Sequence, residues 1–123
     1  MVWDVAFVDE FDAEVDELDA ATQDELYAAA SLLEQRGPQL GRPYVDTLKG
    51  SRYLNMKELR FRASGGVWRV AFAFDPDRRA ILLVAGDKAG VQETRFYKRL
   101  IATADARFDR HLQRRRRHGP QTS

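Results

Sequence analysis

The stretch from Tyr53 to Lys88 decides the fold, and it reads YLNMKELRFRASGGVWRVAFAFDPDRRAILLVAGDK. Much of it alternates between apolar residues and polar or small ones, which is the two-residue period of a β-strand. Runs of residues that favour tight turns interrupt the alternation at positions 64–66 and 75–77. The stretch therefore predicts three successive strands joined by short turns: residues 53–62, 67–74 and 80–85.

The alternation also assigns the side chains of these strands to the two faces of a sheet. One face of the second strand is bulky and needs a helix to cover it: Trp68, Val70, Phe72 and Phe74. Arg69 points to the opposite face, among small residues. In the first strand Glu58, Arg60 and Arg62 share one phase of the alternation. We expect the face that carries Arg69 to be shallow, open and cationic.

The chain before this sheet predicts one strand and two helices. Residues 2–8 alternate as a strand does, and residues 9–18 change to the spacing of an amphipathic helix. Thr22, followed three residues later by Glu25, has the pattern of a capping box. We therefore expect Thr22 to be the N-cap of a second helix, which ends near Gln35.

The remaining segments predict loops, a last helix and a tail. Residues 39–52 contain two glycines and a proline and predict a connecting loop, as do residues 86–90 after the third strand. A helix is expected to begin between residues 91 and 94 and to extend to residue 112. Residues 113–123 include four consecutive arginines, so we expect a basic, disordered tail after a domain of residues 1–112.

These elements define an α+β protein with the order β-α-α-β-β-β-α. The predicted architecture is a small, mostly antiparallel sheet with helices packed on one face. A chain of 123 residues fits a single domain of this kind.

The composition is that of an ordinary soluble domain, with 44% hydrophobic and 32% charged residues. Cysteine is absent, and no apolar run approaches the roughly 18–20 residues that a membrane span needs. Asp75, Asp77 and Asp87 could form a divalent-metal cluster, but two of them lie in a turn that favours aspartate anyway. We therefore expect a cytoplasmic protein that uses no metal and no cofactor and does not contact a membrane.

The charge is distributed unevenly along the chain, although the net charge is only +1. Residues 1–36 hold eleven acidic side chains and one basic side chain, whereas residues 37–123 hold eight acidic and nineteen basic side chains. This asymmetry favours either a dipolar molecule whose basic surface meets a polyanion, or an acidic, solvated helix without a partner.

The candidate functional residues are mostly cationic, with Glu58 nearby: Lys57, Arg60, Arg62, Arg69 and Lys88. Two guanidinium groups on neighbouring strands can hold a phosphodiester and stabilise the charge that develops on it. A lysine could act as a general base, and in RNA the 2′-hydroxyl would be an internal nucleophile. The alternative is a solvated sheet face with a few salt bridges, such as Glu58 to Arg69.

Several short segments occur in a fixed order: Lys57-Glu-Leu-Arg60, Gly66-Val-Trp-Arg-Val70, Gly86-Asp-Lys88, Arg95-Phe-Tyr-Lys-Arg-Leu-Ile101 and Ala104-Asp-Ala-Arg-Phe-Asp-Arg-His-Leu112. Their order and spacing resemble the RelE/HigB superfamily of type II toxin–antitoxin toxins. The last two segments resemble its HigB-type, phage Gp49-like branch. The resemblance extends over roughly residues 2–112.

The resemblance implies a RelE-like fold and a toxin that cleaves messenger RNA on the ribosome. Such a toxin cuts without a metal, by attack of the 2′-hydroxyl, and so inhibits translation and arrests growth. The resemblance also implies a cognate helix-turn-helix antitoxin as partner, and contact with operator DNA only through the antitoxin complex.

The resemblance assigns roles to single residues as well. Carried over by motif, Arg60 and Arg69 bind and stabilise the phosphate, and Lys88 contacts RNA or takes part in proton transfer. Tyr97 is the nearest counterpart of a C-terminal tyrosine in RelE-like enzymes. The general base stays open among Glu58, Lys57 and Lys88. Further residues are expected to bind RNA: Lys57, Arg62, Arg95, Lys98 and Arg99.

Two other functions stay open at the level of the sequence. A toxin of the same fold could act on a target other than RNA, as relatives that poison DNA gyrase do. The chain could also be a non-catalytic nucleic-acid-binding module that uses its basic last helix and its arginine-rich tail.

Overall fold

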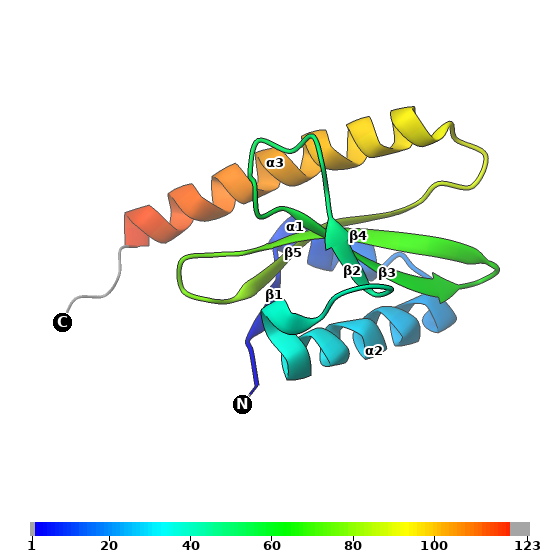
Figure 1. Cartoon of the computed structure of the whole chain (residues 1–123), viewed down its shortest axis with the longest axis horizontal. Helices are drawn as coiled ribbons and strands as arrows, with labels where there is room; N and C mark the ends of the chain where they lie inside the picture. Colours follow the sequence, from blue (N-terminus) through cyan, green and yellow to red (C-terminus); the bar gives the residue numbers. More distant parts are fainter. Residues whose placement is uncertain (1, 119–123) are drawn as a thin grey trace.

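The computed structural model describes residues 2–118, which form a five-stranded sheet and three α-helices (Figure 1). The elements in chain order are β1 (Val5–Phe7), α1 (Asp9–Val15), α2 (Ala20–Arg36), the 3₁₀ turn η1 (Gly37–Gln39), β2 (Val45–Thr47), β3 (Lys57–Ala63), β4 (Gly66–Phe74), β5 (Ala80–Asp87) and α3 (Glu93–His118). The α+β class is confirmed. The predicted order of helices and strands is also found, with β2 as an additional short strand.

The strands lie in the order β1-β5-β4-β3-β2. The pairs β2–β3, β3–β4 and β4–β5 are antiparallel, and only β1 pairs with its neighbour β5 in parallel. The two predicted hairpins therefore form the centre of the sheet. In the first hairpin Arg60 lies opposite Arg69, and Glu58 lies opposite Ala71. This register places the side chains of Glu58, Arg60 and Arg69 on one face, as the alternation predicted.

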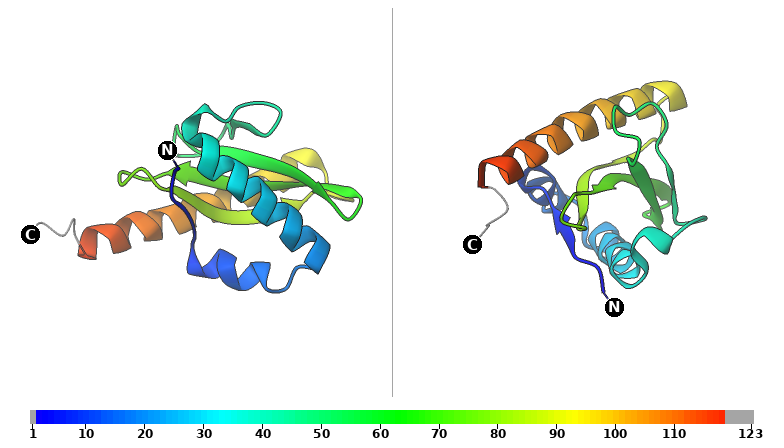
Figure 2. Two further views of the ribbon diagram at one scale, coloured as in Figure 1. Left: turned by 90° about the horizontal axis from the view of Figure 1, so that it is seen from below. Right: turned by 60° about the vertical axis from the view of Figure 1, so that its left-hand side comes forward.

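The helices lie on both faces of the sheet, so the expectation of helices on one face was wrong. Figures 1 and 2 show α2 along one face and α3 across the other. The face that carries Arg69 has small residues because α3 packs closely against it. A Cβ atom on Gly86, which pairs with Arg69 in the sheet, would lie 2.8 Å from Cε1 of Phe96 in α3. Small residues here mark a close helix contact instead of an open surface.

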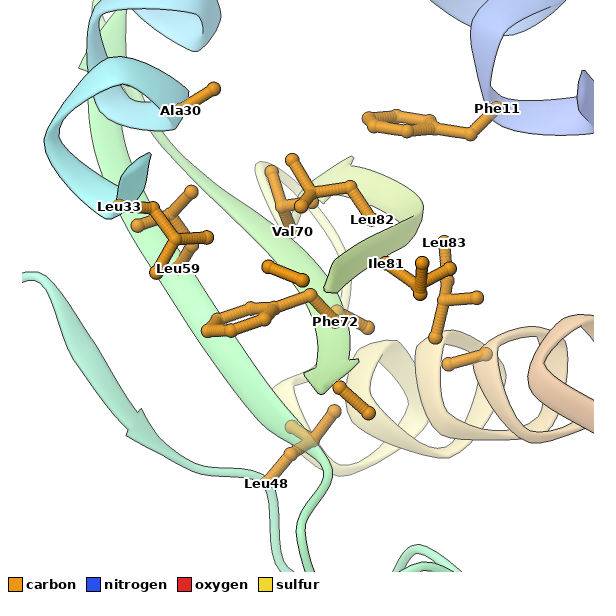
Figure 3. Packing of buried hydrophobic residues seen from close by; sticks show 14 of the residues in the cluster. Phe11, Ala30, Leu33, Leu48, Leu59, Val70, Phe72, Ile81, Leu82 and Leu83 are labelled. Atoms are coloured by element: carbon orange, nitrogen blue, oxygen red, sulfur yellow. The ribbon is translucent and has the colours of Figure 1, made fainter. Parts of the chain in front are cut away.

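One hydrophobic core extends through the sheet to both helical layers (Figure 3). Leu33 of α2 and Leu59 of β3 fill the α2 side of the sheet, whereas Ile81 and Leu83 of β5 lie on the side of α3. Phe72, near the end of β4, has no exposed surface. The apolar run at the start of β5 is buried because helices cover that strand on both faces.

The start of α2 differs from the predicted capping box. Asp19 is the N-cap residue, and its Oδ1 atom accepts a hydrogen bond of 2.7 Å from the backbone N–H of Thr22. Thr22 lies inside the helix and is buried, with its hydroxyl 3.3 Å from that of Ser64. The prediction of Thr22 as N-cap was therefore wrong, because Asp19 precedes it and is an equally suitable cap.

Strands β2, β3 and β5 also differ from the predicted boundaries. Residues 39–52 contain β2, which pairs with Lys57 to Leu59, so they are not only a loop. β3 begins at Lys57, because residues 53–56 belong to a turn, and β5 continues to Asp87. The pairing of β2 with β3 ends at Leu59. Beyond it, one more backbone hydrogen bond, of 2.8 Å, joins the N–H of Arg60 to the carbonyl of Tyr44. Within residues 2–118 no strand flanks the end of β3, so its outer edge is open there.

α3 continues to His118, six residues beyond the predicted end of the domain at residue 112. The prediction of a disordered tail was therefore wrong for residues 113–118, and residues 119–123 lie outside the described residues. Ion pairs hold this half of the helix against the rest of the protein: Arg107 with Glu14, Arg110 with Glu10, and Arg115 with Asp77. The acidic N-terminal region thus neutralises part of the basic helix. Within residues 2–118 no helix is long and apolar enough to cross a membrane.

Candidate functional site

The buried carboxylate of Glu58 is the centre of the candidate site. Glu58 is 3% exposed and lies on β3, on the face that α3 covers. Its Oε2 atom accepts a hydrogen bond of 2.6 Å from Nη2 of Arg60. Its Oε1 atom accepts one of 2.8 Å from the hydroxyl of Tyr97 and lies 3.9 Å from Nε of Arg69. Two arginines and a tyrosine therefore surround one carboxylate.

The elements that form this cluster come from distant parts of the chain. The β3–β4 hairpin places Arg60 opposite Arg69, and α3 brings Tyr97 over the same face. The close approach of α3 depends on Gly86, since a larger side chain at that position would collide with Phe96. The sheet supplies the charged groups, and α3 closes the site over them.

Arg69 is the more enclosed of the two arginines, with its side chain 12% exposed. Its guanidinium group lies 5.9 Å from the ring centroid of Phe96 and 5.8 Å from that of Tyr97. The Nη1 atom donates a hydrogen bond of 3.3 Å to the carbonyl of Val67, whereas the buried Nε atom has no hydrogen-bond partner within residues 2–118. The aromatic rings therefore position the group, and its buried Nε atom lies toward the Glu58 carboxylate, at 3.9 Å from Oε1.

Arg60 is half-buried and lies at the edge of the site. In addition to Glu58, it approaches Oδ2 of Asp46 on β2, at 3.5 Å. Asp46 also pairs with Arg42, at 3.2 Å. Asp46 was not among the predicted site residues, because a strand of three residues is too short to show an alternating pattern. The only signal was its position three residues after a proline, within a region expected to be a loop.

The surroundings shift the pKa values of two members of the cluster. Burial raises the pKa of the Tyr97 hydroxyl, and its hydrogen bond to the Glu58 carboxylate raises it further. The hydrogen bond from Arg60 to Glu58 raises the pKa of the Arg60 guanidinium. Tyr97 therefore keeps its proton at neutral pH, and the cluster holds a protonated donor beside a carboxylate.

The other predicted site residues lie outside this cluster. Lys88 follows β5 and pairs with Glu93. Lys57 shares its phase with Leu59 and so lies on the opposite face of β3 from Glu58. Arg62 is exposed on β3, and three further predicted RNA-binding residues are exposed on the first turns of α3: Arg95, Lys98 and Arg99. The structure therefore favours Glu58 over both lysines as the group closest to the two arginines.

The aspartates that were weighed as metal ligands have other partners. Asp75 contacts Arg79 and His111, and Asp77 contacts Arg115. Oδ1 of Asp87 accepts a hydrogen bond from the backbone N–H of Ala89. Within residues 2–118 no three histidine or carboxylate side chains are grouped so that they could hold a metal ion.

The fold is that of a RelE-like α+β protein. The E. coli toxin RelE, solved in the free state as a double arginine-to-alanine mutant, superimposes with a TM-score of 0.60. The match covers 83% of this chain and 96% of that structure, at 13% sequence identity. At this identity the likeness establishes the fold and nothing about the residues of the site.

The chain belongs to the family of phage-derived Gp49-like proteins, the HigB-type branch of the RelE/HigB superfamily, whose sequence model matches residues 13–109. Two proteins of Mycobacterium tuberculosis are similar in sequence. The inferred toxin HigB2 is 47% identical over 87% of this chain, and the inferred toxin HigB3 is 51% identical over 68% of it. The matched regions span 53% of HigB2 and 71% of HigB3, so this chain corresponds to about half of the first relative. The resemblance found in the sequence is thereby confirmed at the level of the family.

Proposed function

We propose that this chain is the toxin component of a type II toxin–antitoxin system and that it cleaves messenger RNA on the ribosome. Membership of the RelE/HigB superfamily and the names of the two mycobacterial relatives support the first part. The observation that carries the second part is the cluster of Arg60, Arg69 and Tyr97 around the carboxylate of Glu58. Two guanidinium groups beside a candidate base suit the cleavage of a phosphodiester.

In the proposed mechanism Arg60 and Arg69 bind the scissile phosphate through charge-assisted hydrogen bonds. Glu58 accepts the proton of the 2′-hydroxyl, the 2′-oxygen attacks phosphorus, and the bond from phosphorus to the 5′-oxygen breaks. The two arginines stabilise the additional negative charge on the phosphate oxygens in the transition state. The products are a 2′,3′-cyclic phosphate and a free 5′-hydroxyl.

The leaving 5′-oxygen needs a proton, and Tyr97 is the candidate donor. Burial and the contact with Glu58 raise its pKa, so the phenol is protonated at the pH of the cell. In the unliganded protein the same hydroxyl holds Glu58 in position, at 2.8 Å. Every group in this scheme is a side chain of the protein, and no metal takes part in any step.

The remaining parts of the proposal concern partners. A toxin of this kind needs an antitoxin, and we propose a cognate helix-turn-helix protein that also mediates any contact with operator DNA. Exposed cations on α3 are available for ribosomal RNA, namely Arg95, Lys98 and Arg99. We place the activity in the cytoplasm, where ribosomes translate messenger RNA.

The test is translation of a defined message in a purified bacterial system, with new RNA ends mapped by primer extension. Wild type is expected to produce cuts only when ribosomes occupy the message. Arg69→Gln should abolish them, since it removes one of the two phosphate-binding charges while keeping most of the side chain beneath α3. Arg36→Gln, an exposed arginine at the end of α2, is the matched control and should cut like wild type.

Different results would lead to the other candidate functions. Growth arrest with intact RNA, together with covalent complexes of gyrase and DNA, would replace the proposal by a toxin with a DNA-topology target. Binding to nucleic acid without cleavage or growth arrest would indicate a binding module.

A further inference from the structure

A cleft of about 580 Å³ lies where α2 passes the outer edge of β3. This volume is within the range of small-ligand sites in proteins. The apolar or small side chains that line it come from α2 and β3: Ala28, Ala29, Leu32 and Phe61. Arg60 and Arg69 line the same cleft. The cleft is therefore continuous with the proposed phosphate site.

Three further side chains of the lining can recognise a planar, polar group. Tyr44 is 46% exposed, and its ring is therefore accessible to a ligand. Arg62 and Glu25 are exposed, one on β3 and the other on α2. Single-stranded RNA is recognised by stacking of bases on aromatic rings and by hydrogen bonds from side chains to base edges. An arginine and a carboxylate supply the donors and the acceptor for such readout.

We propose that this cleft holds one nucleobase of the RNA chain whose scissile phosphate lies on Arg60 and Arg69. Tyr44 stacks on the base, and Glu25 and Arg62 select its identity. The cleft thus determines which base stands next to the cut. The inference rests on the proposed function, because it places the phosphate of the same RNA on the two arginines.

The charge of the cleft favours RNA over a protein segment as the occupant. Three of its residues are arginines, and within residues 2–118 Glu25 is the one carboxylate that lines it. Two of these arginines belong to the phosphate site, so a nucleotide bound there places its neighbour in the cleft. A peptide strand paired with the open edge of β3 would be the competing occupant, and the test distinguishes the two.

The test measures the binding of an RNA pentanucleotide that cannot be cut, because its central residue carries no 2′-hydroxyl. The phosphate 3′ to this residue stands for the scissile phosphate, and two further versions of the RNA lack the base on its 5′ or on its 3′ side. Fluorescence anisotropy at low salt should show that wild type binds one of the two base-free versions about tenfold more weakly than the intact RNA. Tyr44→Ala should bind the intact RNA about tenfold more weakly than wild type does. It should bind the base-free version that wild type discriminates against as strongly as it binds the intact RNA.

Two more variants complete the test, one as a control and one that blocks the cleft. Tyr27→Ala removes another half-exposed tyrosine, which lines a separate pocket on α2, and should bind all three RNAs as wild type does. Ala28→Trp fills the cleft from an exposed helical position and should weaken binding of the intact RNA as Tyr44→Ala does.

Equal binding of all three RNAs by wild type would overturn the inference. If Arg69→Gln still weakened binding in that case, the phosphate site would stand without a base cleft. If Arg69→Gln bound and cleaved RNA as wild type does, the proposed function itself would be wrong. If Ala28→Trp left RNA binding unchanged but abolished co-purification of a protein partner, the cleft would be a peptide-docking groove and the inference would be wrong.

Discussion

Glu58 is a charged side chain that is almost completely removed from water, at 3% exposure. A buried charge is stable only with partners that replace its hydration. Its partners are Arg60, Arg69 and Tyr97, and each of them is also placed to contact an RNA phosphate in the proposed reaction. The carboxylate therefore offsets the repulsion between the positive charges of Arg60 and Arg69 before a phosphate binds.

The substitution Glu58→Gln tests whether this carboxylate acts as a base. We expect cleavage to fall at least on the order of 100-fold, the usual contribution of general-base catalysis. Unfolding free energy should fall by only about 1–3 kcal/mol, because the amide oxygen of the introduced glutamine still accepts the hydrogen bond from Tyr97. Cleavage rates in the translation assay and urea unfolding check the two parts. Glu58→Asp, which keeps the charge, is the control and should retain more activity than the glutamine variant.

A folded Glu58→Gln protein that cleaves at the wild-type rate would contradict the assignment. Glu58 would then be a structural counter-ion, and the base would have to be sought elsewhere.

At this scale the sequence predicted some positions and not others. Alternation placed Glu58, Arg60 and Arg69 on one face, because the register of a hairpin follows from its pattern and turn. Contact between Tyr97 and Glu58 could not be predicted from the pattern, since it depends on how α3 crosses the sheet 39 residues further along the chain. Asp46 was missed because its strand is only three residues long.

Among the elements, the C-terminal half of α3 depends most on polar contacts. The side chain of Asp75, at the end of β4, has no exposed surface and accepts hydrogen bonds from the backbone of Asp77 and Arg79. It also contacts His111 of α3 at 2.9 Å. Burial alone raises the pKa of Asp75, but the hydrogen bonds from His111 and Arg79 outweigh it and lower the pKa below its ordinary value.

This shift predicts how the stability of the protein depends on pH. A carboxylate with a lowered pKa in the folded state stabilises it above the unfolded pKa, near 4, and this contribution disappears as the pH falls through the folded value. We expect Asp75→Asn to be about 1–3 kcal/mol less stable than wild type at pH 7. The difference should become smaller as the pH falls from about 5 to about 2, which urea unfolding followed by tryptophan fluorescence can measure.

Asp24→Asn, an exposed position on α2, is the matched control and should differ little from wild type across this pH range. A difference between Asp75→Asn and wild type that stays constant with pH would show that the charge of Asp75 contributes nothing, and that only its hydrogen bonds matter.

α3 shows why the local sequence pattern did not predict the helical structure of residues 113–118. The composition of residues 113–118 is typical of a disordered segment, and yet α3 continues through it. Arg115 pairs with Asp77 on the turn after β4, and such a contact between distant residues leaves no trace in local sequence. The long apolar period of the helix up to Leu112 was visible, because each turn buries residues on one side.

At the scale of the whole molecule, ion pairs within the fold neutralise part of the charge asymmetry between the acidic N-terminal region and the basic remainder. Glu10 and Glu14 of α1 pair with arginines in the second half of α3. In the first turns of the same helix Arg95 and Arg99 are exposed and have no ion pair within residues 2–118. The basic surface of α3 that is available to a polyanion therefore lies at its start and, near its end, at the exposed Arg116 and Arg117, and not along its whole length.

Salt dependence of ribosome binding tests this division. For Arg95→Gln/Arg99→Gln we expect the slope of log affinity against log salt to decrease in magnitude by about 1.5, as two phosphate contacts are lost. Arg110→Gln/Arg115→Gln changes the net charge equally but removes arginines that are paired with Glu10 and Asp77, so its slope should stay near that of wild type. Co-sedimentation with ribosomes at several salt concentrations measures both. An equal decrease in this slope for the two variants would mean that net charge alone governs binding.

The arrangement of layers was the main error at this scale. The face on which Arg69 lies among Val67, Ala71 and Ala73 was expected to be open, because small side chains leave a shallow surface. The structure shows that such a face can also receive a helix at close range, with Phe96 directly above Gly86. Pattern alone cannot distinguish these two cases, since the small residues are the same in both.

The position of α3 at the end of the described chain also has a consequence for synthesis. Glu58, Arg60 and Arg69 leave the ribosome before Phe96 and Tyr97 do, because a chain is made from its N-terminus. While α3 is still being made, the sheet lacks the helix that covers Arg69 and the hydroxyl that holds Glu58. A nascent chain therefore lacks the complete cluster around Glu58 until α3 has been made and can dock on the sheet.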